Sequence, residues 1–179
     1  MATVPSQDNW SAGEFPTAAK LNKNIRDAVN FLMNPPEARL ARKLTAQTGL
    51  GNGSTTAIIF DSTLLDNDSM TNIATANTRI TITTAGAYNV GVAAQLVVGA
   101  DLANARWMQL SIRKNGGVNI ATSVMPQYGV GLGSGMSFSI PNNCVAGDYF
   151  EIVCNSAGSA FQTNAVGDGA MLYARWIGN

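Results

Sequence analysis

The side chains in this sequence that could do chemistry are carboxylates, and no histidine accompanies them. The chain holds 11 Asp and Glu residues and no His, which removes the usual general base, the Ser-His and Cys-His nucleophile pairs and most zinc sites. Two convergent acids would suffice for a glycosidase, but Asp is also favoured in turns. We therefore predict turn chemistry, no catalytic residue and no enzyme. The candidate acids after Lys43 are Asp61, Asp66, Asp68, Asp101, Asp148, Glu151 and Asp168.

The segment from Asp66 to Ser69, with the sequence Asp-Asn-Asp-Ser, offers oxygen atoms that could bind calcium. It lacks the glycine and the downstream glutamate of an EF-hand loop, and an ordinary Asx-type turn accounts for the same residues. The glycine-rich segment from Gly129 to Gly135 lacks the Lys-Ser/Thr ending of a phosphate-binding loop, so we expect a strand connection there. The sequence thus predicts no bound metal and no cofactor.

Two cysteines, Cys144 and Cys154, are too few for the disulfide scaffold of a small secreted protein. Cys154 falls at an inward position of an alternating segment, "YFEIVC", which a buried free thiol explains. A disulfide between the two cysteines stays the alternative.

The tryptophans Trp10, Trp107 and Trp176 offer two kinds of recognition, because aromatic rings stack on sugars and also anchor subunit contacts. We place Trp107 and Trp176 on the side of their strands opposite to the inward residues. That position favours a subunit interface over a ligand platform, since interface cores are enriched in aromatic residues. With Tyr88, on a strand whose outward side is uncharged, they make up the predicted trimer interface.

Charge and hydropathy narrow the class of protein. The 11 basic residues balance the 11 acidic ones, so no basic field exists to hold a nucleic acid. No segment approaches the roughly 18 apolar residues of a membrane span, and the opening "MATVPSQDNW" is unlike a signal peptide. We expect a soluble protein made in the cytoplasm. Charged residues are 12% of the chain, against about 25% in an ordinary domain, which predicts that other subunits cover part of its surface.

Residues 17 to about 33 are predicted to form one helix. Thr17 can cap its first turn, and Asn34 ahead of Pro35 and Pro36 ends it. Five apolar residues at a 3-4-3-4 spacing form a stripe on one side: Ala18, Leu21, Ile25, Ala28 and Leu32. A helix of about 16 residues is marginal in isolation, so this stripe must pack on something.

From about Leu40 onward the hydrophobic period changes from helical to two residues. The clearest segment is "AYNVGVAAQLV", in which every second residue from Tyr88 to Leu96 is directed inward. Asn115-Gly116, between two alternating segments, predicts a type I′ hairpin. We count eight to ten strands separated by Gly, Asn and Ser turns, which is typical of an antiparallel sandwich or jelly roll.

Four segments in order, "FDSTLLDNDSM", "NTRITITTAGAYNVGVAAQL", "IRKNGG" and "VAGDYFEIV", resemble the jelly-roll domain shared by tumour necrosis factor and the globular heads of complement. The resemblance covers Arg39 to Asn179. It implies an all-β, antiparallel jelly-roll sandwich with a short N-terminal α-helical extension, divided into an attachment segment (1–38) and a head domain (39–179). It also implies a homotrimer with a structural or binding role rather than catalysis.

The N-terminal segment "NWSAGEFPTAAKLNKNIRDAVNFLMNPP" resembles the front end of virion proteins from tailed phages of actinobacteria. The resemblance implies a capsid decoration protein or short head fibre on the virion surface, assembled in the host cytoplasm. Its helix stripe would attach it to phage capsid or tail proteins, either directly or by gathering three N-termini. The alternative is a minor tail protein at the tail tip that binds a host cell-surface glycan or protein.

Overall fold

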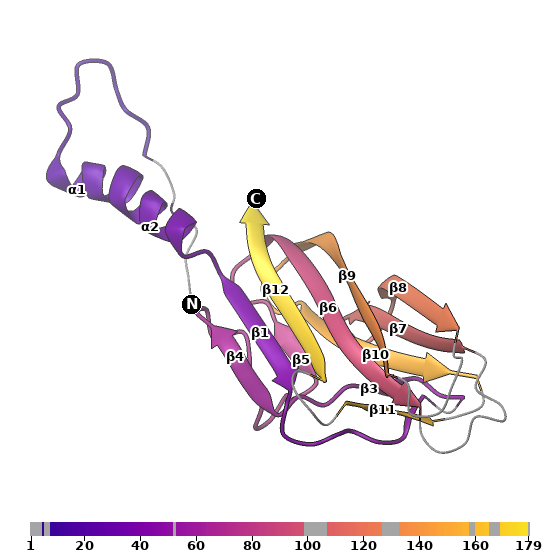
Figure 1. The fold of residues 1–179 in the computed structure, drawn as a ribbon. Helices are drawn as coiled ribbons and strands as arrows, with labels where there is room; N and C mark the ends of the chain where they lie inside the picture. The colour runs from indigo at the N-terminus through magenta and orange to yellow at the C-terminus, as the bar shows by residue number, and fades with distance from the viewer. Residues whose placement is uncertain are drawn as a thin grey trace.

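The computed structural model describes residue 5 and residues 8–51, 53–98, 107–126, 133–157, 160–164 and 169–178 of the chain. A helical segment projects from one end of two packed layers of strands (Figure 1). The predicted connection at Gly129 to Gly135 lies mostly outside the described residues, as do Asp101 and Asp168. The helix is formed by α1 (Ala18–Leu21), the π-helical turn η1 (Asn22–Asp27) and α2 (Ala28–Met33).

The ends of the helix are where the sequence predicts them. The Oγ1 atom of Thr17 accepts a hydrogen bond from the backbone N–H of Lys20 at 3.2 Å, which satisfies one of the free amides of the first turn. At the other end, Asn34 leaves helical geometry with φ of −137°. Pro35 and Pro36 follow and have no N–H to continue the helix.

The strands form two antiparallel sheets, which confirms the predicted sandwich. The first sheet runs in the order β4-β1-β12-β6-β9, with β11 following β12 along the same edge of β6 and with β2 beside β11. In the second sheet, β7 lies between β8 and β10, and β10 carries β3 and β5 on its other edge. In chain order the strands are β1 (Glu37–Arg42), β2 (Leu50–Gly51), β3 (Thr56–Ala57), β4 (Ser62–Asp66), β5 (Arg79–Thr81), β6 (Gly86–Val98), β7 (Trp107–Lys114), β8 (Asn119–Pro126), β9 (Gly133–Cys144), β10 (Tyr149–Ser156), β11 (Ala160–Thr163) and β12 (Ala170–Gly178).

Two sequence-based boundaries differ from the structure. β1 begins at Glu37 directly after Pro36, so the predicted division at residue 38 falls inside this strand. The period of two predicted from about Leu40 onward includes residues 55–61, but this segment forms only the two-residue strand β3. The backbone N–H of Ile59 there donates to the side chain of Gln47 at 2.7 Å rather than to a neighbouring strand.

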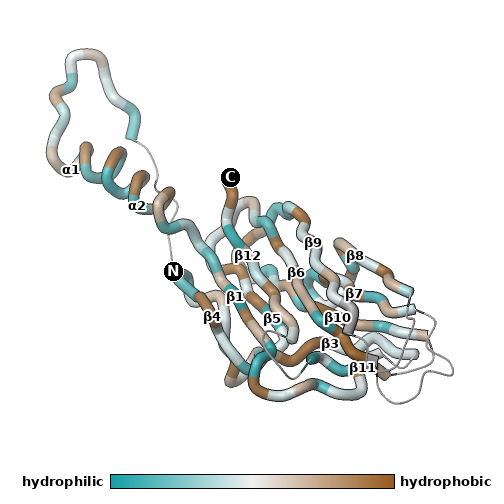
Figure 2. The backbone as a smooth tube through the Cα atoms, viewed as in Figure 1, coloured by the Kyte–Doolittle hydropathy of each residue, from teal (hydrophilic) through white to brown (hydrophobic). Residues whose placement is uncertain are grey.

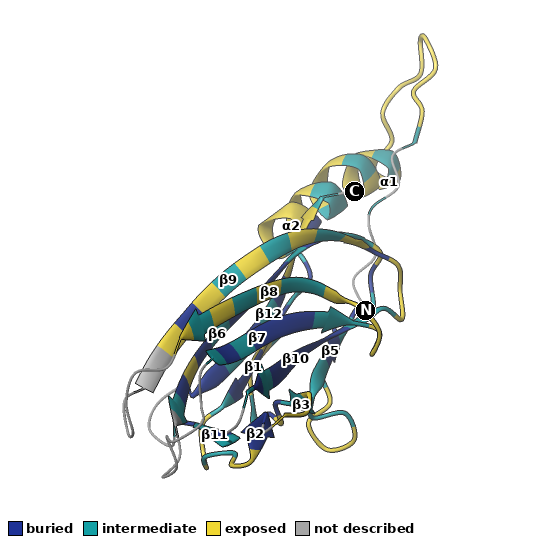
Figure 3. Cartoon of the chain, turned by 90° about the vertical axis from the view of Figure 1, so that its right-hand side faces the viewer, coloured by how far each residue is buried: buried dark blue, intermediate teal, exposed yellow. Residues whose placement is uncertain are grey.

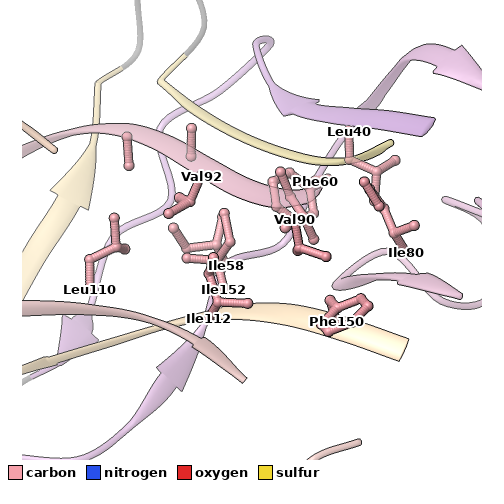
Figure 4. Packing of buried hydrophobic residues seen from close by; sticks show 14 of the residues in the cluster. Leu40, Ile58, Phe60, Ile80, Val90, Val92, Leu110, Ile112, Phe150 and Ile152 are labelled. Atoms are coloured by element: carbon pink, nitrogen blue, oxygen red, sulfur yellow. The ribbon is translucent and has the colours of Figure 1, made fainter. Parts of the chain in front are cut away.

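The core lies between the two sheets and is made by every second residue of the long strands (Figure 4). On β6 the residues predicted to face inward, from Tyr88 to Leu96, are all buried. They meet Leu110 and Ile112 of β7 and Ile152 of β10 across the sandwich. Each such aliphatic side chain removed from water contributes about 1.5–3 kcal/mol, so this layer is the main source of stability.

The hairpin and the thiols also agree with the sequence. Asn115 and Gly116 have φ of 52° and 67°, the positive values that a type I′ turn requires, and they join β7 to β8. Cys144 and Cys154 are both buried and both free, which confirms the thiol interpretation. Burial raises the pKa of the Cys154 thiol to about 12 and that of Cys144 to about 11. Neither thiol is ionised near neutral pH.

We predict that neither a reductant nor a chelator lowers the thermal unfolding midpoint by more than about 5 °C, which corresponds to roughly 1–2 kcal/mol at this size. The reason is that both cysteines are free and that the described residues contain no group of three or more potential metal ligands. Differential scanning calorimetry with and without each reagent measures the shift. A larger drop with reductant would reveal a disulfide, and a larger drop with chelator a structural metal.

Candidate functional site

The β-domain carboxylates that the structure describes are engaged by donors of the chain itself. Asp61 accepts backbone hydrogen bonds from Lys43 at 2.8 Å and Leu44 at 2.9 Å, which close the turn after β1. Burial raises the pKa of Asp61, but these hydrogen bonds outweigh it and leave the pKa below its usual value. The Asp61 carboxylate therefore stabilises this turn.

The candidate calcium loop has the same character. Asp66 accepts from the backbone N–H groups of Met70 and Thr71 at 2.9 Å each, and from the Thr71 hydroxyl at 2.8 Å. Asp68 is buried and accepts from the hydroxyls of Thr83 at 2.5 Å and Thr84 at 2.7 Å. These oxygens face N–H and O–H donors, which is the arrangement of a turn and not of a cation site.

The two remaining described acids hold strands together. Asp148 accepts from the Asn115 side chain at 2.8 Å and pairs with Lys114 at 2.8 Å, which ties the β7–β8 hairpin to the start of β10. Burial opposes its ionisation, yet the bonds from Asn115 and Lys114 lower its pKa to about 2. Glu151 pairs with Arg113 at 2.8 Å on the outward side of the second sheet. Two acids aimed at a common substrate position are not found among the described residues.

The outward side of the first sheet carries few charges. On β6 it consists of Asn89, Gly91, Ala93 and Gln95, of which Gly91 is buried. The Tyr173 ring of β12 lies directly over Gly91, where any Cβ atom would collide with it. A glycine inside a strand therefore lets an aromatic ring lie flat against this sheet.

Charged residues on this surface are gathered at the end nearest the helix, and they neutralise one another. Glu37 pairs with Arg39 at 2.6 Å and with Arg175 at 3.8 Å. The three line a groove of about 300 Å³ together with Asn89, Met171 and Tyr173. The centre of the surface thus carries uncharged side chains, and a balanced ion cluster lies at one end.

The N-terminal helix carries an apolar row that no other part of the described chain covers (Figures 2 and 3). The exposed fractions of its large side chains are 38% for Leu21, 56% for Ile25, 46% for Val29, 66% for Leu32 and 80% for Met33. We call these five residues the helix row. Leu21, Ile25 and Leu32 belong to the predicted stripe, and Ala18 is also exposed.

Ala28 does not lie where the stripe predicts it. It is half-buried, and Val29 takes its place on the exposed side. The cause is the π-helical turn Asn22–Asp27, in which more residues fit in one turn than in an α-helix, so the exposed side moves on by one residue. The sequence pattern assumes a uniform α-helix and therefore misses Val29 and Met33.

Phe31 joins the helix to the head. It is the buried residue of α2, and its ring meets Trp176 of β12 edge-on at 4.8 Å between centroids. The backbone N–H of Trp176 donates to Pro36 at 2.8 Å, which fixes the chain between helix and β1. Gly86 leaves room for the indole, because a Cβ atom there would collide with Trp176. The helix is thus seated on the C-terminal strand and not merely tethered to the head.

Asn67, in the loop after β4, strengthens this joint between the helix and the head. Its side chain donates to the Asn34 side chain at 2.9 Å and to the Pro35 carbonyl at 2.8 Å. Its Oδ1 atom accepts from the backbone N–H of Glu37 at 2.7 Å. Neither Asn67 nor Phe31 was among the predicted site residues, because their partners lie far away in the sequence.

The aromatic residues of the predicted trimer interface are placed differently from one another. Tyr88 is fully buried and donates its hydroxyl to the Thr84 carbonyl at 2.7 Å, so it offers no surface to another subunit. Trp176 continues the inward row of β12 after Ala174, so the predicted outward position is wrong. The strand ends there in an irregularity, and Phe31 covers the ring. Trp107 begins β7 and is half-buried, on the side opposite to Met108.

No protein-family model matches the chain, and no curated protein matches it. Its structure is similar to the globular domain of zebrafish complement 1qA protein, with a TM-score of 0.55 at 12% sequence identity. The similarity covers 80% of this chain and 99% of that domain. At this identity the likeness concerns the fold, and it confirms the all-β jelly roll of the complement and tumour necrosis factor type.

Within the part of the chain that the structure describes, no helix is long and apolar enough to span a membrane.

We predict that stability is constant between about pH 5 and 8 and falls as the pH drops from about 4 towards 2. The chain has no histidine to titrate in the neutral range. Hydrogen bonds and Lys114 hold the folded-state pKa of Asp148 at about 2, so its contribution is present above its unfolded value of about 3.8 and is lost on acidification. We expect Asp148 to account for about 1–2 kcal/mol of the loss.

Urea unfolding followed by circular dichroism at a series of pH values measures this profile. Asp148→Asn is the matched control, which should be less stable at pH 7 and flatter between pH 4 and 2. Identical acid slopes for the variant and the wild type would contradict the role given to Asp148.

Proposed function

We propose that the protein is a non-enzymatic structural protein of a phage virion. It is a homotrimeric capsid decoration protein or a short head fibre. Its jelly-roll head is displayed, and its N-terminal segment docks it on the particle. The observation that carries this proposal is the helix row, an apolar surface on an element that projects beyond the head (Figure 1). A short helix with an uncovered apolar side needs a partner to be stable. The resemblance of residues 9–36 to virion proteins supports a particle as the place of assembly.

The proposed trimer rests on the outward side of the first sheet. Its central strand presents Asn89, Ala93 and Gln95 without a charge, with Gly91 beneath the Tyr173 ring. β9 beside it presents Ser137 and Ser139. Small uncharged residues allow close approach of another subunit and cost little to desolvate, whereas charged residues are depleted at interface cores. A closed symmetric assembly that buries this side also explains the low charge of the head.

The proposed absence of catalysis rests on the described carboxylates. Each of these acids accepts a hydrogen bond or forms an ion pair within the chain: Asp61, Asp66, Asp68, Asp148 and Glu151. A general acid or base needs an environment that moves its pKa towards the working pH. Asp61, Asp66 and Asp148 are instead shifted to lower pKa.

Location on the particle separates the proposed function from the tail-tip alternative. Gold-labelled antibody against the head, viewed on virions by electron microscopy, should decorate the capsid if the protein is a decoration protein or head fibre. Label confined to the tail tip would instead support a receptor-binding module for a host glycan or protein.

We predict a solution mass of three times the chain mass of 18.7 kDa, and dissociation by Ala93→Glu. Burying a charge without a partner costs several kcal/mol, and Ala93 lies at the centre of the proposed interface but outside the core. Light scattering measures the mass, and circular dichroism shows that the head is still folded.

Val124→Glu is the matched control for this experiment, because Val124 is an exposed apolar residue on β8 of the other sheet. It should leave the mass unchanged. A single-chain mass for the wild type would contradict the proposed interface. Dissociation by Val124→Glu and not by Ala93→Glu would also contradict it.

We predict that the double variant Leu21→Asp, Ile25→Asp keeps a folded head but fails to occupy virions that lack the protein. Each of these side chains contributes roughly 1.5–3 kcal/mol when buried, and the new charges would be unpaired. Bound copies are measured after co-sedimentation with the particles. The control is Ala19→Asp, which adds a charge on the opposite side of the same helix. Equal occupancy by the double variant and the wild type would show that attachment does not need the helix row.

A further inference from the structure

The helix row needs a partner whose chemistry can be read from its surroundings. The row consists of Leu21, Ile25, Val29, Leu32 and Met33, all exposed. It spans nearly the full helix, from α1 to the end of α2. The contact that covers it must therefore be another elongated apolar surface of similar length.

The charged side chains of the helix are paired within the chain. Lys20 pairs with Glu14 and Lys23 pairs with Asp8, each at 2.5 Å, so the loop before the helix is held along its polar side. Arg26 pairs with its neighbour Asp27 at 2.9 Å. No charge belongs to the row itself.

An uncharged row is what a symmetric self-contact requires. Around a threefold axis each side chain meets copies of itself, so a charged residue in the row would be placed against like charges. A foreign partner imposes no such condition and commonly meets complementary charges at the rim. The absence of charge from the row therefore favours a second copy of the chain as its occupant.

One end of the row, at Leu32, adjoins the proposed head interface. A groove of about 380 Å³ is lined by Leu32 of the row, by Pro35 and Trp176 of the joint, and by Asn89, Arg175 and Ile177 at the end of the first sheet. Asn89 and Arg175 also line the groove on the outward side of that sheet. The helix row and the sheet surface thus meet at Leu32 and Asn89, on the two sides of this groove.

The joint keeps these two parts in register. Phe31 packs on Trp176, and Asn67 holds Asn34 and Pro35 by its side chain. A helix fixed to its head cannot swing away when three heads meet. Contact between the heads then brings the three helix rows to the same axis.

We propose that the partner of the helix row is the same row in two other copies, so that the N-terminal helices form a three-helix contact continuous with the head trimer. This inference rests on the proposed trimer. It assigns the row to self-assembly, and docking on the particle then falls to the outer surface of the three gathered segments.

Cysteine cross-linking tests the contact in the full-length protein. Leu21→Cys and Ile25→Cys place a thiol in the row, and Ala19→Cys places one on the opposite side of the helix, since residues two apart point in nearly opposite directions. The native Cys144 and Cys154 are buried and free, so they do not compete for the oxidant. The mass of each reduced variant is measured first by light scattering, and each is then oxidised at low protein concentration and run on a non-reducing gel.

We expect a trimeric mass and a covalent dimer that includes up to about two thirds of the chains for a row cysteine, because thiols around a threefold axis bond in pairs. The yield should exceed that of Ala19→Cys at least about fivefold, since a disulfide forms only when the Cα atoms come within about 7 Å. A trimeric mass without cross-linking by either row cysteine, or with equal cross-linking by Ala19→Cys, overturns the three-helix contact and leaves the head trimer standing. A single-chain mass for the wild type overturns both.

Discussion

The contact between the two sheets is the interaction on which the remainder of the molecule depends. β6 runs through the middle of the first sheet, with β9 on one edge and β12 and β11 on the other. Its inward residues from Tyr88 to Leu96 must all reach the same dry layer. A shift of one residue in the pairing would turn that whole set outward, so the burial of one side fixes the register of all its neighbours.

That register decides what the outward side presents. Once Val90 and Val92 face the core, Gly91 must face outward, and the Tyr173 ring of β12 lies over it. Charged residues are confined to the end of the sheet, where Glu37 balances Arg39 and Arg175. The hydrophobic core therefore creates, on its reverse side, a surface suited to contact with another subunit.

The last residues of the core also carry the helix. Trp176 ends the inward row of β12, and its ring meets the Phe31 ring of the helix. Phe31 is the buried residue of α2, and the residues of the helix row are exposed. The head and the helical segment thus differ: the head has a dry core of its own, whereas the apolar row of the helix is not covered by the described chain.

Local chemistry in the sequence determined the helix ends, the alternating strands, the Asn115-Gly116 hairpin and the buried thiols, because a cap, a proline, a period of two and a turn dipeptide act within a few residues. It also indicated the sandwich and the lack of charge on its outward side. Tertiary structure alone decided the rest. Trp176 was placed on the wrong side because the alternation of its strand does not say which set of every second residue faces inward; the burial of Leu172 and Ala174 decides it, and Trp176 continues their row. Val29 replaced Ala28 in the exposed row because a π-helical turn breaks the regular helical period. The joint at Asn67 could not be foreseen, since it joins residues some thirty positions apart and a sequence pattern carries no distance between such segments.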